Sequence, residues 1–127
     1  MEKAALYSED MGNFDTWGTD GKGTEIAYNL MRDNQSMWGA GIYLDDNAKG
    51  FNVHDNVVED TAWYGLIFKD LDTLKNNTVL GSGHQAVYCY PPQDKDLTGA
   101  VVAHNRVLER FPLRVSLNQA AVTDYGY

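Results

Sequence analysis

The sequence has a single cysteine, Cys89, so no disulfide can form within the chain. No apolar run approaches the roughly 20 residues of a membrane-spanning helix, and the first residues lack the apolar core of a secretory signal peptide. Basic residues are also few, because ten lysines and arginines stand against eighteen aspartates and glutamates, for a net charge of −8. Nucleic-acid phosphates would repel such a chain, so we expect neither a nucleic-acid nor a membrane partner. These absences leave the cellular compartment open.

The composition is that of one soluble globular domain, which we expect to span residues 1–127. The hydrophobic share of 43% and the charged share of 22% are ordinary for a folded protein. A long helix is hard to place anywhere, whereas short segments of alternating apolar and polar residues, bounded by Gly, Asn or Asp, are frequent. Such segments predict strands and turns.

Two short patterns alternate along the chain. The first, an apolar residue followed by two residues, Asn, one residue and a second apolar residue, occurs at 26–31, 53–58, 74–79 and 102–107. Its asparagines are Asn29, Asn56, Asn77 and Asn105, separated by 27, 21 and 28 residues. The second is a five-residue strand pattern at 5–9, 41–45, 65–69, 86–90 and 112–116.

A repeat of 21 to 28 residues with two or three strands predicts an all-β fold, a right-handed parallel β-helix of about four to five coils. Loops of unequal length fit this solenoid because insertions leave the stacking of strands intact. Equivalent residues of stacked coils lie about 4.8 Å apart, so inward-facing asparagines at a bend can hydrogen-bond from coil to coil. We therefore expect the four asparagines to form a structural ladder.

Alternation also predicts which side chains of the second pattern face the core. The expected inward residues are Leu6, Ser8, Ile42, Leu44, Leu66, Phe68, Val87, Cys89, Leu113 and Val115. Cys89 is then a small core side chain rather than a reactive thiol.

Segments 21–29, 41–46 and 53–58 resemble the right-handed β-helix repeat proteins of the pectate-lyase-like superfamily. The resemblance extends from about Leu6 to Leu108. It implies a relation to polysaccharide lyases and glycoside hydrolases, which are usually secreted and bind sugar in a groove along one stacked sheet. An extracellular location follows from the resemblance alone. Those proteins usually have more coils and often a helical N-terminal cap, whereas this sequence opens directly into a predicted strand.

The outward positions of the second pattern carry aromatic and charged side chains. One predicted column reads Tyr7, Tyr43, Ile67, Tyr88 and Arg114, and the next reads Glu9, Asp45, Lys69, Tyr90 and Ser116. Nearby loops add Trp38, Trp63 and His84. Aromatic rings stack on sugars and polar groups bind their hydroxyls, so we expect a polysaccharide or oligosaccharide to bind Tyr7, Tyr43, Tyr88, Tyr90, Trp38, Trp63 and Arg114. The alternative is that the tyrosines follow β-propensity and the carboxylates only solvate the face.

Two catalytic chemistries remain open beside simple binding. Glycoside hydrolysis needs two carboxylates about 5 Å apart, or roughly 6.5–9.5 Å for inversion, and Glu9 with Asp45 or Asp46 with Asp70 are the candidate pairs. Polysaccharide lysis needs a base and a neutralised sugar carboxylate. For that reaction, Lys69 or Arg114 would neutralise the carboxylate, and His84, Tyr43 or Tyr88 would accept the proton.

We expect no cofactor and no metal centre. Calcium remains an alternative, because Glu9, Asp10, Asp45, Asp46 and Asp70 are rich in oxygen ligands, but they match no compact calcium loop. The three histidines fall in different parts of the coil and predict no zinc site.

A structural or assembly role is a further hypothesis. A parallel β-helix exposes an unpaired sheet edge at each end. The predicted first strand at Leu6 leaves only residues 1–5 to cover the N-terminal edge, whereas residues 117–127 can cover the other. We therefore expect a homodimer through the N-terminal coil end.

Overall fold

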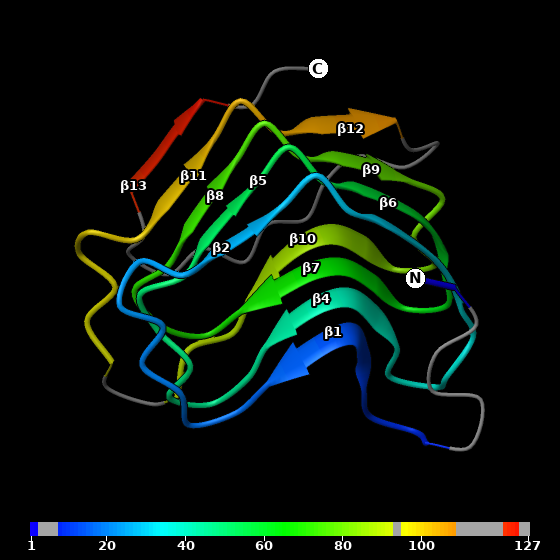
Figure 1. Ribbon diagram of the computed structural model, residues 1–127, viewed down its shortest axis with the longest axis horizontal. Coiled ribbons are helices and arrows are strands. Elements are labelled where there is room, and N and C mark those ends of the chain that lie inside the picture. Colours follow the sequence, from blue (N-terminus) through cyan, green and yellow to red (C-terminus); the bar gives the residue numbers. More distant parts are fainter. Residues whose placement is uncertain (3–7, 93–94, 109–120, 125–127) are drawn as a thin grey trace.

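The computed structural model describes residues 1–2, 8–92 and 95–108 and the backbone of residues 121–124. Within these residues every strand pairing between named strands is parallel, and three sheets form the three sides of a stack (Figure 1). Sheet 1 consists of β1 (Gly12–Thr16), β4 (Ala40–Leu44), β7 (Tyr64–Phe68) and β10 (Gln85–Cys89). Sheet 2 consists of β2 (Glu25–Ala27), β5 (Asn52–His54), β8 (Thr73–Lys75), β11 (Val101–Ala103) and β13 (Ala121–Asp124). Sheet 3 consists of β3 (Leu30–Asn34), β6 (Val57–Thr61), β9 (Thr78–Leu80) and β12 (Arg106–Leu108).

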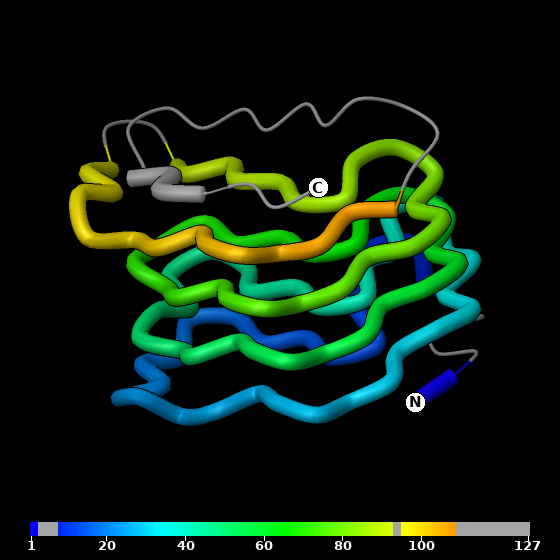
Figure 2. Tube along the Cα trace, turned by 90° about the horizontal axis from the view of Figure 1, so that it is seen from above, coloured from blue at the N-terminus to red at the C-terminus, as the bar shows by residue number. Residues whose placement is uncertain are grey.

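The chain passes through the three sheets in turn, so that each coil lies on the preceding one (Figure 2). The described residues form four such coils, and β13 adds a strand beside β11. The predicted parallel β-helix of four to five coils is therefore confirmed. Among the described residues, no helix has the length and apolarity that crossing a membrane requires.

The core lies between the three sheets and is filled by apolar side chains from strands of all three. Six of the residues predicted to face inward are buried there: Ile42, Leu44, Leu66, Phe68, Val87 and Cys89. Apolar residues that flank the ladder asparagines are buried as well, including Val53, Val58, Leu74 and Val79. Leu6, Leu113 and Val115 lie outside the described residues, and Ser8 is half-buried and precedes the first strand.

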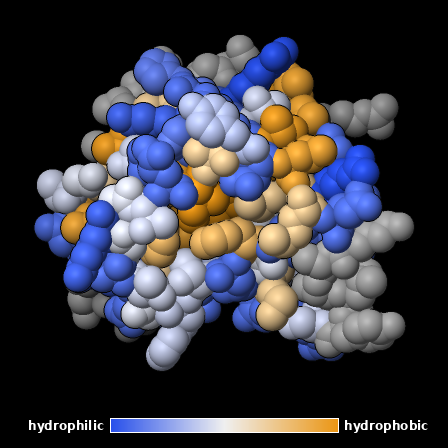
Figure 3. All heavy atoms as spheres, in the orientation of Figure 1, coloured by the Kyte–Doolittle hydropathy of each residue, from blue (hydrophilic) through white to orange (hydrophobic). Residues whose placement is uncertain are grey.

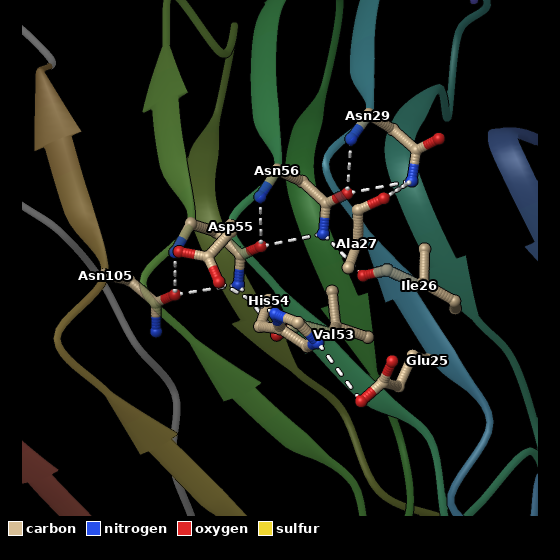
Figure 4. Close-up of polar contacts among 10 residues, drawn as sticks. Glu25, Ile26, Ala27, Asn29, Val53, His54, Asp55, Asn56 and Asn105 are labelled. Carbon is tan, nitrogen blue, oxygen red and sulfur yellow. Dashed lines mark hydrogen bonds and ion pairs between the residues drawn. The ribbon is translucent and has the colours of Figure 1, made fainter.

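The predicted asparagine ladder is present at the bend between sheets 2 and 3 (Figure 4). Each side-chain amide donates to the Oδ1 of the asparagine in the next coil, from Asn29 through Asn56 and Asn77 to Asn105, at 2.9–3.0 Å. The same Oδ1 atoms accept the backbone N–H of the preceding asparagine, at 3.0–3.1 Å. Asn56, Asn77 and Asn105 are buried, so the ladder satisfies polar groups that the bend removes from water.

The first coil begins later than the sequence pattern predicted, which corrects the strand placed at residues 5–9. In sheet 1, β1 pairs with β4 so that Phe14 lies beside Ile42 and Asp15 beside Tyr43. Ile42 follows Phe14 by 28 residues, close to the length of the other coils, but follows Leu6 by 36. Phe14 packs against the core. The segment that carries Phe14 therefore supplies the first described strand of sheet 1.

Two glycines change the alternation of sheet 1. A Cβ atom at Gly65 would lie 2.4 Å from Val79 Cγ1 in the core and 2.4 Å from the backbone oxygen of Ala86. Gly41 similarly faces Val58 Cγ1, at 2.2 Å. Glycine is needed at both positions because sheets 1 and 3 approach closely there. Since Gly65 and the following Leu66 both face inward, the outward positions of β7 are Tyr64 and Ile67.

Candidate functional site

A groove of about 280 Å³ lies on the outer face of sheet 1. Its lining residues come from all four coils and are Asp10, Trp38, Tyr43, Tyr64, Ile67, Lys69, Tyr88 and Tyr90. Tyr43 and Ile67 are only 8% and 3% exposed and form the floor, whereas Trp38 and Tyr90 are 45% and 59% exposed and form walls. The parallel register places these side chains on successive rungs, so the groove runs along the stack rather than around a coil.

The aromatic walls are connected by ring contacts. Tyr64 and Tyr88 stack with centroids 4.6 Å apart and an interplanar angle of 3°, and Tyr88 is also stacked with Tyr90 at 5.8 Å. Trp38 packs edge-on against Trp63 at 4.9 Å, and Trp63 in turn contacts Tyr64. These contacts hold each ring in place, so the walls are organised without a ligand.

Lys69 extends into the groove and is held there by charge and by aromatic faces. Its Nζ lies 2.5 Å from Asp45 Oδ1 and 3.2 Å from Asp46 Oδ1. The same atom lies over the ring of Tyr43, 5.3 Å from its centroid, and over that of Tyr90, at 5.9 Å. Burial lowers the pKa of Lys69, but the hydrogen bond to Asp45 and the neighbouring negative charges outweigh it and raise the pKa above its ordinary value. The ammonium group therefore stays protonated.

The N-terminal end of the groove is acidic. Burial is the main reason that the pKa of Asp15 is raised, and the charges of Asp45 and Asp10 add to it, against a hydrogen bond from the Gly12 N–H. Burial likewise raises the pKa of Tyr43 to about 12, so its phenol remains neutral. Within the part of the chain that the structure describes, Asp10 has no ion-pair partner.

The structure brings together most of the residues predicted to bind sugar. The groove is lined by Tyr43, Tyr88, Tyr90 and Trp38, and the ring of Trp63 packs against that of Trp38. Tyr7 and Arg114 lie outside the described residues. Tyr64 is a lining residue that sequence reasoning missed, because strict alternation predicted Gly65 as the outward position of its strand.

The predicted catalytic residues do not form the expected pairs. Glu9 is not one rung from Asp45, because β1 ends at Thr16, and the Asp45 N–H donates to the Thr16 carbonyl. The Glu9 carbonyl instead accepts the N–H of Trp38. The physical reason is the later start of the first coil.

Asp46 and Asp70, the second candidate carboxylate pair, form ion pairs with two different lysines, and His84 packs against an aromatic ring. Asp46 pairs with Lys69, whereas Asp70 is buried and pairs with Lys95. The His84 ring lies 4.7 Å from that of Trp63.

Asp72 is a buried carboxyl group inside the coil and is 2% exposed. Its Oδ1 accepts the Phe51 N–H at 2.9 Å, and its Oδ2 has no hydrogen-bond partner among the described residues. Burial is the main reason that the pKa of Asp72 is raised to about 7, and the charge of Asp70 adds to it. Burial also raises the pKa of Cys89 to about 12, which agrees with its predicted role as a core side chain.

A protein-family model described as periplasmic copper-binding protein (NosD) matches residues 7–113, most of the chain. The chain belongs to the NosD family. This is a β-helix family, in agreement with the observed sheets. The match does not name the pectate-lyase-like superfamily that the sequence resembles. No curated protein and no solved structure is detectably similar to the chain.

The description of the NosD family raises the question whether the residues present fit a copper ion. Every histidine, cysteine and methionine of the sequence lies within the described residues, and these are the nitrogen and sulfur side chains that copper prefers. In that part of the chain, no three His, Cys, Asp or Glu side chains are grouped so that they could hold a metal.

His54 has the most suitable surroundings, yet its neighbours do not converge on one point. Asp55 lies 2.8 Å from its Nδ1, whereas Glu25 lies 3.7 Å from its Nε2, on the other side of the ring (Figure 4). Cys89 is buried in the core. The His, Cys, Asp and Glu side chains that the structure describes therefore do not form a copper site of three or more ligands.

Proposed function

We propose that this chain is a carbohydrate-binding β-helix module that holds an oligosaccharide in the groove of sheet 1. The observation that carries the proposal is the ordered aromatic lining, in which exposed Trp38 and Tyr90 stand above a floor of Tyr43 and Ile67. Pockets that bind small ligands combine apolar and aromatic walls with a few placed polar groups. Carboxylates and tyrosine hydroxyls are suitable hydrogen-bond partners for sugar hydroxyls. The family description supports a periplasmic setting for this activity.

The charges in the groove favour binding over catalysis. Lys69 is already neutralised by Asp45 and Asp46, so it is not free to compensate a uronate in lyase chemistry. Its raised pKa also excludes it as a base at neutral pH. Because Asp46 and Asp70 each pair with a different lysine, they do not act on one another as the acid and base of a hydrolase. The supported function is recognition of a sugar without its cleavage.

The test of this proposal is a pair of wall substitutions with a matched control. Calorimetric titration against a panel of oligosaccharides should detect binding by the wild type, with and without calcium. We expect Trp38→Ala together with Tyr88→Ala to weaken binding at least about tenfold, equivalent to about 1.4 kcal/mol, because the stacking surface is lost. Tyr28→Ala is the control, since Tyr28 is 81% exposed and does not line the groove.

Two results would contradict the groove as the binding surface. One is equal weakening by the wall variant and the Tyr28 variant, and the other is the absence of binding by the wild type to every sugar on the panel. Far-ultraviolet circular dichroism must show that the wall variant remains folded. Release of reducing sugar or of unsaturated products during the titration would instead identify an enzyme.

A second candidate function is assembly through the N-terminal coil end, as predicted from the sequence. β1 and β2 are the last described strands of their sheets at this end, whereas Glu2 forms a parallel bridge to Arg32 beside β3. Figure 3 shows apolar side chains gathered near the middle of this end. Met11 and Leu30 are 42% and 45% exposed. Strands that end a sheet among the described residues, with apolar neighbours, favour pairing with a second copy.

Light scattering after size exclusion should therefore give twice the 14.2 kDa mass of one chain. We expect Leu30→Lys to shift the mass toward the monomer, because a charge at the contact opposes its burial. Leu108→Lys is the matched control, since Leu108 is similarly exposed, at 49%, but lies on β12, at the opposite end of sheet 3. A wild-type monomer mass that does not change with concentration would refute the dimer.

A further inference from the structure

The groove contains more negative than positive charge. Asp10 lines it directly, and Asp15, Asp45 and Asp46 lie close enough to interact with Asp10, Tyr43 or Lys69. Lys69 is the only basic side chain among the lining residues that the structure describes, and it is occupied by Asp45 and Asp46. Among the residues that the structure describes, neither Asp10 nor Asp15 forms an ion pair with a basic side chain. An anionic sugar would meet net repulsion at this end of the groove.

The groove already binds one cation, namely the ammonium group of Lys69. That group is surrounded by the ring faces of Tyr43 and Tyr90 and by two carboxylate oxygens. Aromatic faces attract ammonium groups through their quadrupole, and the attraction grows as water is excluded. The remaining walls, Trp38, Tyr64 and Tyr88, have the same chemical character and lie in the same groove as Asp10. The lining is therefore complementary to a second ammonium group, carried by a ligand.

We infer that the groove selects oligosaccharides with protonated primary amines, with Asp10 as their counter-charge, over neutral and uronate sugars. This inference rests on the proposed carbohydrate binding and names the class of sugar. The aromatic walls supply the stacking surface that any sugar ring uses. Asp10 and the rings supply the part of the binding that depends on charge, so this part should weaken as salt screens the carboxylate.

The experiment compares three probes of equal length by calorimetric titration: glucosamine oligomers with free amines, their fully N-acetylated counterparts and oligogalacturonate. We expect the free-amine oligomers to bind at least about tenfold more tightly than the acetylated ones at low salt and oligogalacturonate to bind most weakly. Asp10→Asn should weaken binding of the free-amine oligomers about threefold more than it weakens binding of the acetylated oligomers. Glu25→Gln is the control, because it removes the same charge from an exposed position on sheet 2.

The possible failures are distinguishable. Equal affinity for acetylated and free-amine oligomers would overturn the amine inference and leave the proposed sugar binding intact. Binding of none of the three probes, or of any other sugar on the panel, would overturn the proposed function. If Asp10→Asn and Glu25→Gln have the same effect on the preference for amines, Asp10 is not the counter-charge of the bound amine.

Discussion

Replacement of Asn56 by leucine is expected to lower the free energy of unfolding by about 1–3 kcal/mol. The Asn56 amide donates to the Ile26 carbonyl at 2.7 Å and to Asn77 Oδ1 at 2.9 Å, and its Oδ1 accepts from Asn29. Leucine has a similar size but offers none of these bonds. The substitution therefore leaves a buried carbonyl without its donor and interrupts the ladder in the middle of the stack. Urea unfolding followed by circular dichroism measures the change.

Asn29→Leu is the matched control for this prediction. Asn29 is the first member of the ladder, and it is exposed. Water can replace the hydrogen bonds of an exposed amide, so we expect a loss below about 1 kcal/mol. Equal losses at Asn29 and Asn56 would show that burial of the ladder does not determine its contribution to stability.

The second large effect concerns the buried carboxyl group of Asp72 and should depend on pH. Its pKa is raised to about 7 by burial, whereas an unfolded aspartate titrates near 3.9. Between these values the folded protein binds one proton more than the unfolded chain. The free energy of unfolding therefore falls as pH rises from about 4 to about 7, by on the order of 3 kcal/mol from this residue, and changes little from this source above pH 8.

Asp72→Asn removes the titration while keeping the size of the side chain and an oxygen for the Phe51 N–H. We expect the stability of this variant, relative to the wild type, to increase steadily from pH 4 to pH 8. Denaturant unfolding at five pH values across that interval gives the difference directly. A constant difference would show that Asp72 is ionised in the folded protein throughout. The neighbouring Asp70–Lys95 ion pair is retained in both proteins.

The sequence predicted the ladder and the core because both follow from side chains at fixed spacing. Asn29, Asn56, Asn77 and Asn105 occupy the same position in successive coils, and buried amides in such a column have few partners except one another. The prediction of the first strand failed because residues 5–9 alternate as a strand should. The true strand, β1, contains Asn13 and Asp15, and its polar character concealed its role.

Part of the groove lining was also predicted from the spacing of side chains along the strands. Tyr43, Tyr88 and Tyr90 were assigned by alternation, which holds where a strand is regular. Tyr64 was missed because Gly65 faces inward, and a requirement for close sheet packing is not visible in a single sequence. Asp72 was missed because it is a buried polar residue with only one of its oxygens bonded, and such residues contradict the usual expectation that aspartate is exposed.

The direction of the groove has a consequence for the dynamics of the fold. Among the described strands, each coil pairs only with the coils next to it. The stack therefore resembles a one-dimensional lattice that frays from its ends. Amide hydrogens of β4–β9 should therefore exchange with solvent more slowly than those of β1 and β10. A ligand that contacts both Asp10, before β1, and Tyr90, after β10, would bridge all four coils. We expect it to act as a clamp that slows exchange at both ends of the stack at once.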